Sequence, residues 1–213
     1  MIVAETWSMY DSFNRSWRSL LWPESSFIED LVAACELKSG TRMLDVGCGT
    51  GSLLERAGYG EPGALLYGVE PTLDALNLAR RRLGGSGERV RLLEGCGQSL
   101  PFENNSFDVI ALTMVLDELG LATRHQVLAE TRRVLATGGH VLVADWSAAW
   151  PAWLALAAAP ARVLAQAAGI GPDPPDDRGP GYELESAGFS QPRLVQRFVA
   201  LSGDVELWKA GKG

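Results

Sequence analysis

Short apolar runs alternate with segments of helical periodicity through the middle of the chain. Between the runs, residues 73–82 and 124–135 repeat apolar positions at three- and four-residue intervals, as one buried face of a helix requires. Parallel strands need crossover helices, so this alternation predicts a doubly wound, mostly parallel α/β sheet with its active site beyond the carboxyl ends of the strands. The runs that suit buried strands are residues 43–46, 64–69, 90–93, 107–112 and 140–144.

The N-terminal flank, residues 5–38, has the spacing of two helices divided near Pro23. Its first half carries Tyr10 among aromatic residues that are spaced along one helical face. Two interpretations stay open: this face packs against the sheet, or it forms a lid that closes over the active site.

The segment 148–170 is rich in alanine, leucine, tryptophan and valine but is interrupted by Pro151 and Pro160. A membrane span needs about 20 strongly apolar residues, so we expect one or two helices that cap the sheet and no stable membrane insertion. Residues 169–181 are rich in proline, glycine and aspartate, which predicts a loop. The predicted chain ends with a short helix over 182–187 and strands over 192–200 and 204–210.

Composition and charge restrict the number of domains, the kinds of partner and the cellular location that the sequence predicts. The chain has 213 residues, 46% of them apolar, and a formal net charge of -7, which together predict a single domain over residues 1–213 without a nucleic-acid partner. Three cysteines are too few and too dispersed for a disulfide framework or a zinc knuckle, so no metal site is expected. Glu5 stands where a signal peptide needs basic charge, which favours a cytoplasmic location.

The segment from Asp45 to Gly51 reads Asp-Val-Gly-Cys-Gly-Thr-Gly, follows a predicted strand and opens a helix. Its glycines let the backbone take positive φ angles and let a ligand approach bare N–H groups. A dinucleotide-binding turn spaces its glycines as G-x-G-x-x-G, whereas this turn is G-x-G-x-G with an acid just before it. The Asp45 carboxylate would repel a pyrophosphate, but it suits a ligand that has an ammonium, a sulfonium and no phosphate.

A second acid, Glu70, ends the next predicted strand. A carboxylate at this place can accept hydrogen bonds from both hydroxyl groups of a ribose, and it rejects a 2′-phosphate. Together, Asp45, the glycines and Glu70 predict a site for S-adenosylmethionine rather than for NAD or a nucleoside triphosphate.

Four motifs stand in order along the chain, at residues 44–51, 68–72, 100–109 and 133–139. The series resembles that of the class I S-adenosylmethionine-dependent methyltransferases, and most of all the branch of the ubiquinone/menaquinone biosynthesis methyltransferases. This resemblance implies a transferase with a Rossmann-like fold, a doubly wound, mostly parallel seven-stranded sheet and N-terminal helices. It divides the chain into an N-terminal helical lid (1–40), a cofactor-binding core (41–146), a variable cap and loop (147–181) and a C-terminal helix with strands (182–213).

Carried over residue by residue, the resemblance implies that Asp45 and the glycine turn hold the amino-acid part of S-adenosyl-L-methionine, and that Glu70 holds its ribose. Pro71 would lie against the adenine. Family members usually have an aspartate that accepts from the adenine amino group where this chain has Cys96. A thiol is a poor acceptor, so adenine recognition would rely on neighbouring backbone groups or on stacking, with lower affinity. The implied cofactor-binding residues are Asp45, Gly47, Cys48, Gly49, Thr50, Gly51, Glu70, Pro71, Cys96, Gly97, Gln98, Thr113 and Leu116.

Methyl transfer is an in-line displacement at a carbon that the sulfonium already activates, so positioning dominates and a dedicated base is not always needed. An acceptor that must lose a proton needs a base, and the candidates near the strand ends are Asp117, Asp145 and His125. A structural role explains each of them as well, since acids that open a helix interact favourably with its dipole. Trp146 is a candidate wall of the acceptor site and Tyr10 a candidate lid residue.

The predicted function is methyl transfer to a small, hydrophobic or amphipathic acceptor. The apolar segment 148–170 and Trp146 motivate this acceptor class, although core packing explains the same residues. The alternative is a catalytically silent protein that keeps the fold for binding or regulation, an interpretation supported only by Cys96. The glycine spacing and Asp45 exclude a nicotinamide-dependent oxidoreductase. The sequence leaves the methylated atom and the oligomeric state open.

Overall fold

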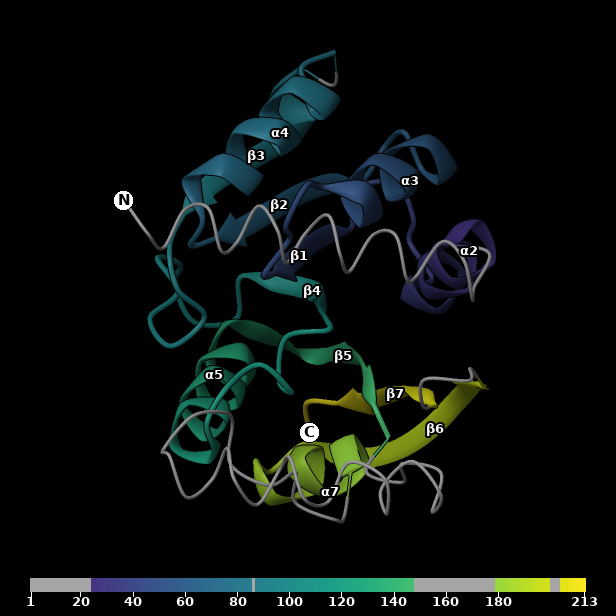
Figure 1. Cartoon of the computed structure of the whole chain (residues 1–213), viewed down its shortest axis with the longest axis vertical. Coiled ribbons are helices and arrows are strands. Elements are labelled where there is room, and N and C mark those ends of the chain that lie inside the picture. Colours follow the sequence, from purple (N-terminus) through teal and green to yellow (C-terminus); the bar gives the residue numbers. More distant parts are fainter. Residues whose placement is uncertain (1–23, 86, 148–178, 200–203) are drawn as a thin grey trace, which may run out of the picture.

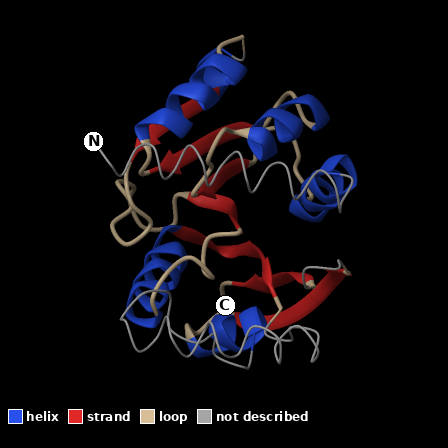
Figure 2. Ribbon diagram, in the orientation of Figure 1, coloured by secondary structure: helices blue, strands red, loops and turns tan. Residues whose placement is uncertain are grey.

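The computed structural model describes residues 24–85, 87–147, 179–199 and 204–213. A central sheet runs through the molecule, with helices on both sides of it (Figures 1 and 2). Helix α2 (Glu24–Cys35) stands where the second N-terminal helix was predicted. The first predicted helix with Tyr10, and the predicted cap at 148–170, lie outside the described residues.

The sheet of the described residues has seven strands in the order β3-β2-β1-β4-β5-β7-β6. Strands β1 to β5 are parallel to their neighbours within that group, and β7 runs antiparallel to both β5 and β6, which confirms the doubly wound, mostly parallel prediction. The strand order reverses at β1 and β4, and ligands of such folds bind beyond the carboxyl ends of the strands at that point. The strands are β1 (Arg42–Val46), β2 (Leu65–Glu70), β3 (Val90–Glu94), β4 (Phe107–Thr113), β5 (Leu135–Trp146), β6 (Ser190–Phe198) and β7 (Val205–Gly211).

Each face of the sheet has its own hydrophobic core. On one face, α2 and α3 pack over Met43 and Ala111, and on the other, α5 and α7 pack over Ile110 and Val143. Both faces of the central strands are therefore covered, which is why the sequence of β1 and β4 is apolar almost without alternation. The remaining helices are α3 (Ser52–Gly60), α4 (Leu73–Leu83), the 3-10 turn η1 (Gly87–Arg89), α5 (Leu121–Val134) and α7 (Gly179–Ser186).

Strand β5 begins at Leu135, five residues before the predicted start. Its pairing with β4 shifts from Phe107–Leu135 to Val109–His140, so the stretch between contains an irregularity. Gly138 has a φ of 79° there. The predicted strand over residues 140–144 lies within β5, but its start was placed too late because the irregular stretch before His140 has no continuous apolar run.

Helix α7 begins at Gly179, so the predicted loop to residue 181 and the helix start at residue 182 were wrong. Proline is tolerated in the first turn of a helix, where its missing N–H has no partner to lose, and Pro180 lies there. Gly181 faces the indole of Trp208, and a Cβ on it would lie 2.6 Å from that ring. This glycine serves close packing rather than loop flexibility.

The β6–β7 hairpin reverses direction beside the end of β5. Trp146 pairs with Val205, and the N–H of Ser147 donates to the carbonyl oxygen of Asp204 at 2.7 Å. Phe198, the last residue of β6, also pairs with Val205. The connection between β6 and β7 therefore starts and ends at the same edge of the sheet as the carboxyl end of β5.

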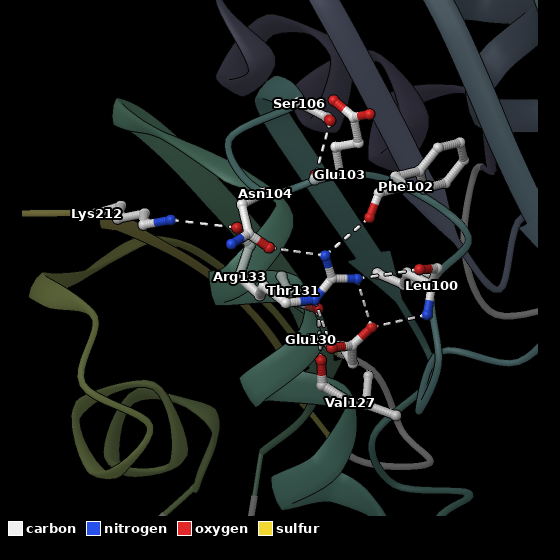
Figure 3. A network of polar contacts seen from close by, with 10 residues as sticks. All are labelled: Leu100, Phe102, Glu103, Asn104, Ser106, Val127, Glu130, Thr131, Arg133 and Lys212. Atoms are coloured by element: carbon white, nitrogen blue, oxygen red, sulfur yellow. Dashed lines mark hydrogen bonds and ion pairs between the residues drawn. The ribbon is translucent and has the colours of Figure 1, made fainter.

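Glu130 and Arg133, one turn apart on α5, form hydrogen bonds with the backbone of the loop before β4 (Figure 3). Oε2 of Glu130 accepts from the N–H of Leu100 at 2.8 Å, and Arg133 donates to the carbonyl oxygens of Leu100 at 3.0 Å and Phe102 at 2.8 Å. The two side chains also pair with each other at 2.7 Å, and the hydrogen bond from Arg133 lowers the pKa of Glu130. Arg133 and Leu100, 33 residues apart, thus join two of the sequence motifs, those at residues 133–139 and 100–109.

In the part of the chain that the structure describes, no helix combines the length and the apolar character that a membrane crossing requires.

Candidate functional site

The glycine turn between β1 and α3 is tied to the neighbouring strand β2. The N–H groups of Gly47 and Cys48 both donate to the carbonyl oxygen of Val69, at 2.8 and 3.1 Å. Gly47 has a φ of 73°, and a Cβ there would lie 2.7 Å from Cγ2 of Val115, so this position requires glycine. Gly49 has open space where a Cβ would stand. The turn therefore presents bare backbone at the carboxyl edge of the sheet.

Asp45, near the end of β1, is only 2% exposed. Among the described residues, its buried Oδ1 has no hydrogen-bond partner. Burial first, and then the charge of Glu70, raise the pKa of Asp45 to about 7. A buried carboxyl oxygen without a donor is unfavourable, and a cationic ammonium group of a ligand would supply both a donor and a compensating charge.

Glu70 ends β2 and meets the turn from the other side. Its Oε2 accepts from the N–H of Gly49 at 2.9 Å, and its Oε1 accepts from the N–H of Thr72 at 2.9 Å. An ionised carboxylate has about four lone-pair sites, so both oxygens keep the capacity to accept from the hydroxyl groups of a ligand. Asp45 pairs with Gly68 in the sheet, which brings the two acids to the same edge.

The segment after β3 lies against the ends of β1 and β2. The N–H of Gly95 donates to the carbonyl oxygen of Glu70 at 3.2 Å, and a Cβ on Gly97 would lie 3.0 Å from Cγ1 of Val46. The Cys96 thiol between them is exposed and free. The structure thus brings the predicted adenine segment next to the glycine turn and Glu70. The other residues predicted to contact adenine, Pro71 and Gln98, are exposed.

Cys48 is a packing residue of the glycine turn. A Cβ on Gly68 would lie 2.7 Å from its Sγ, so thiol and strand are in close contact. Burial, and then the charge of Asp45, raise the pKa of the Cys48 thiol. The thiol therefore stays protonated and is not a nucleophile.

Thr50 is held by Arg82, a residue that the sequence did not single out. Arg82 donates from Nη1 to the carbonyl oxygen and to the hydroxyl of Thr50, both at 3.1 Å. Arg82 is the last of three consecutive arginines in α4, so its residue type carries no signal. The buried positions of α4, Leu76, Ala79 and Leu83, exclude Arg81 on the opposite side of the helix but do not select Arg82 over Arg80.

A strained turn follows β4. Met114 has a φ of 57°, unusual for a residue with a side chain, and its N–H donates to the carbonyl oxygen of Ala144 at 2.8 Å. Oδ2 of Asp145 then accepts from the N–H groups of Leu116 at 2.8 Å and Asp117 at 3.3 Å. The end of β5 therefore fixes the turn whose Val115 covers Gly47.

Thr113 and Trp146 end β4 and β5 on the face covered by α2 and α3. The Oγ1 of Thr113 is buried and, within the described ranges, without a partner, as is Oδ1 of Asp45 on the same face. Trp146 is half-buried and packs against the core of that face. Leu116, in contrast, is 2% exposed and packs in the opposite core, so its side chain does not line an open site.

Asp117 and Asp145 form a pair of carboxyl groups. Burial, then the charge of Asp117 and a hydrogen bond with it, raise the pKa of Asp145 well above its ordinary value. Oδ1 of Asp117 is buried and has no partner among the described residues. The third candidate, His125, lies on the exposed side of α5, and no hydrogen bond or ion pair between described residues joins it to either carboxyl group. Within the same ranges, no cluster of three or more His, Cys, Asp or Glu side chains is placed to hold a metal ion.

A buried ion pair that the sequence did not predict joins α5, the helix after the Asp117 loop, to α7. Arg124 of α5 pairs with Glu183 of α7 at 2.8 Å, and both side chains are less than 10% exposed. Nε of Arg124 donates to the carbonyl oxygen of Leu119 at 2.8 Å. The pair thus links α7 to the loop that carries Asp117.

The sheet order, the glycine turn and the two acids at the edge of the sheet can now be compared with known protein families. Residues 44–143 match the family model described as a methyltransferase domain. The match covers the core of the chain, a little under half of its 213 residues, and makes this core similar to methyltransferase domains.

Known relatives sharpen the comparison. The chain is 35% identical over 109 residues to a demethylmenaquinone methyltransferase of Thermus thermophilus, covering 51% of this chain and 49% of the relative. It is 30% identical over 120 residues to the ubiquinone/menaquinone biosynthesis C-methyltransferase UbiE of Coxiella burnetii, covering 54% and 47%. The chain spans about half the length of these curated relatives.

Solved structures share the fold. The YcgJ protein of Bacillus subtilis superposes with a TM-score of 0.68 at 16% identity, covering 87% of this chain and 97% of that one. A geranyl diphosphate methyltransferase in complex with SAM gives a TM-score of 0.68 at 17% identity, covering 89% and 86%.

Proposed function

We propose that the chain binds S-adenosylmethionine at the carboxyl edge of its sheet and transfers the methyl group to a small, hydrophobic or amphipathic acceptor. The observation that carries this proposal is the buried, unpartnered oxygen of Asp45 beside a glycine turn anchored on Glu70. A ligand in which an amino acid is linked to a ribose fits this arrangement: its ammonium group can bind the Asp45 oxygen, and its ribose can reach Glu70 across the bare backbone of the turn.

The residues present fit this cofactor. Asp45 and the backbone from Gly47 to Gly51 would hold its amino-acid part, with the Thr113 hydroxyl on the same face. Glu70 would hold the ribose hydroxyls, and the segment around Cys96 would border the adenine. When bound, the cofactor supplies a methyl group on a positively charged sulfur, which makes that carbon reactive toward a nucleophile.

The chain's own contribution is binding, orientation and the exclusion of water. Asp145 fixes the turn after β4 through three backbone N–H groups, those of Leu116, Asp117 and Trp146. For an acceptor that must lose a proton, Asp117 is the proposed base, because none of the described residues donates a hydrogen bond to its buried Oδ1.

The acceptor class rests on two observations. Trp146 places an aromatic ring at the end of β5, where it packs against the core on the face covered by α2 and α3. The relatives are named for demethylmenaquinone and for ubiquinone/menaquinone biosynthesis, which makes a quinone-type acceptor the first class to test.

Isothermal titration with S-adenosylhomocysteine, with NAD as the negative ligand, tests cofactor binding. Glu70→Ala is compared with Glu94→Ala, because Glu94 pairs with Glu70 in the sheet and is exposed at the end of β3. We expect Glu70→Ala to weaken binding by roughly tenfold or more and Glu94→Ala by less than about twofold. Failure of the unmodified chain to bind S-adenosylhomocysteine would overturn the proposal.

Methyl transfer itself is tested with radiolabelled S-adenosylmethionine and a panel of naphthoquinols, phenols, amines and thiols. Transfer to a quinol or another apolar member supports the acceptor class. Cofactor binding without transfer to any member of the panel would favour the catalytically silent alternative.

A further inference from the structure

One side of α4 lies against the glycine turn. A Cβ on Gly51 would stand 2.9 Å from Cδ1 of Leu83 and 3.2 Å from Cβ of Ala79. Arg82 projects from the same stretch of the helix and reaches over the turn to the start of α3. Apolar packing and a cation thus meet at one short piece of backbone.

Arg82 makes four contacts with this backbone and its flanks. Nη1 donates to the carbonyl oxygen and the hydroxyl of Thr50, both at 3.1 Å, and to the hydroxyl of Ser52. Its Nε pairs with Oε2 of Glu55 at 3.5 Å. About a third of the Arg82 side chain stays exposed (32%), so its purpose is not to fill the core.

These contacts hold the backbone that leads into a helix without a side-chain cap. Helix α3 begins after Gly51, which has a φ of 79° and no side chain to cap the helix. The N–H of Gly51 donates to the carbonyl oxygen of Cys48 at 2.9 Å, while Arg82 binds the carbonyl oxygen of Thr50. Both polar groups of the Thr50–Gly51 peptide are therefore occupied, which restrains a turn that its glycines would otherwise leave flexible.

The same helix begins at the other end of the site. Thr72, just before α4, donates its N–H to Oε1 of Glu70 at 2.9 Å, and the N–H of Leu76 donates to the carbonyl oxygen of Thr72 at 3.0 Å. Helix α4 therefore connects the carboxylate proposed to hold the ribose with the turn proposed to hold the amino-acid part.

We propose that Arg82 is a positioning residue that holds the glycine turn in the shape that binds the amino-acid part of the cofactor. This inference rests on the proposed function. It predicts a selective effect, because the polar contacts of Arg82 are with Thr50, Ser52 and Glu55, whereas Glu70 meets the turn at Gly49. A ligand that lacks the amino-acid part does not need the turn.

The test compares S-adenosylhomocysteine with 5′-methylthioadenosine, which keeps the adenosine and the thioether but lacks the amino-acid part. Isothermal titration of Arg82→Ala is expected to show roughly tenfold weaker binding of S-adenosylhomocysteine and less than about twofold change for 5′-methylthioadenosine. Arg82→Lys should recover only part of the loss, since an ammonium lacks the planar fork of donors. Arg81→Ala, at an exposed neighbouring position, is the matched control and should bind both ligands normally.

Hydrogen exchange of the ligand-free protein gives a second readout. In Arg82→Ala, the amides of residues 49–53 should exchange faster, while those of β4 stay unchanged. Equal loss of both ligands, or no loss of either, would overturn the positioning role. If the unmodified chain binds 5′-methylthioadenosine but not S-adenosylhomocysteine, the proposed function and the role of Arg82 both fail. If the unmodified chain binds S-adenosylhomocysteine but Arg82→Ala does not show the selective loss, the proposed function stands and only the role of Arg82 fails.

Discussion

The carboxyl groups of Asp45 and Glu70 come from adjacent strands and meet at one edge of the sheet, where the charge of Glu70 adds to burial in raising the pKa of Asp45 to about 7. A cationic ligand group binds the ionised form of Asp45, so binding below this pKa must first release a proton. We expect the affinity for S-adenosylhomocysteine to fall by up to about tenfold per pH unit as the pH drops below 7. Titration calorimetry across this range in two buffers of different ionisation enthalpy measures both the affinity and the released proton. An affinity independent of pH would contradict the prediction.

Removing the Asp45 charge should stabilise the ligand-free protein. The raised pKa means that the folded state holds a proton that the unfolded state, with its ordinary pKa of 3.8, has lost; the ionised form is thus unfavourable in the fold as the pH rises toward 7. Asp45→Asn is expected to increase the free energy of unfolding by roughly 2–4 kcal/mol at about pH 8 and by little at about pH 4. Urea denaturation at the two pH values checks this. The same variant should bind S-adenosylhomocysteine weakly.

Gly49 and Gly40 offer a matched pair of substitutions. Both have positive φ, 52° and 84°, and open space at the Cβ position, but only Gly49 belongs to the glycine turn. Alanine at either position should cost about 1 kcal/mol of stability because of backbone strain. Only Gly49→Ala should abolish binding of S-adenosylhomocysteine, since its methyl group occupies the approach to the bare backbone. Normal binding by Gly49→Ala would place the ligand elsewhere.

Asp145 and Asp117 should differ in what their loss changes. Asp145→Ala leaves three N–H groups without an acceptor and should destabilise the fold by roughly 2–3 kcal/mol. Asp117→Asn relieves the interaction with Asp145 and should leave stability equal or higher. Its effect should appear in kcat for an acceptor that loses a proton, and not in cofactor affinity. Urea melts and steady-state kinetics with a quinol acceptor that the protein methylates separate the two roles, and a large stability loss in Asp117→Asn would contradict this division.

Cys96→Asp should strengthen cofactor binding. The exposed thiol lies beside Gly95 and Gly97, which touch the ends of β2 and β1, and a carboxylate there would accept from an adenine amino group. We expect roughly three- to tenfold tighter binding of S-adenosylhomocysteine, against little change for Cys96→Ser. Weaker binding in Cys96→Asp would show that the adenine lies away from this segment.

The sequence predicted the central strands β1 and β4 well, because burial on both faces of the sheet leaves continuous apolar runs such as that of β1. Glu70 at a strand end and the turn after Asp45 followed from local pattern and chemistry. Boundaries failed where one residue type serves two purposes: the glycines before His140 lie in a bulge, and Gly181 makes room for Trp208.

The contacts that support the site were beyond the sequence. Arg82 and Thr50 are 32 residues apart, and Arg124 and Glu183 are 59 residues apart, so their pairing depends on how the helices pack. Leu116 shows the reverse: the family resemblance implied a cofactor contact there, but its side chain is buried in the core of the opposite face.

Because β7 runs antiparallel to β5, its first residue, Val205, lies beside the last residue of β5, Trp146. The cofactor contacts proposed above come from the ends of β1, β2 and β3, whereas Val205, at the start of β7, pairs with Trp146 of β5 and with Phe198 of β6. Substitutions at Phe198 or Val205 should therefore alter the surroundings of Trp146 and leave Asp45 and Glu70, which lie on other strands, in place. Under the proposed function, the acceptor preference can thus change at one end of the sheet while the cofactor contacts at the other end are kept.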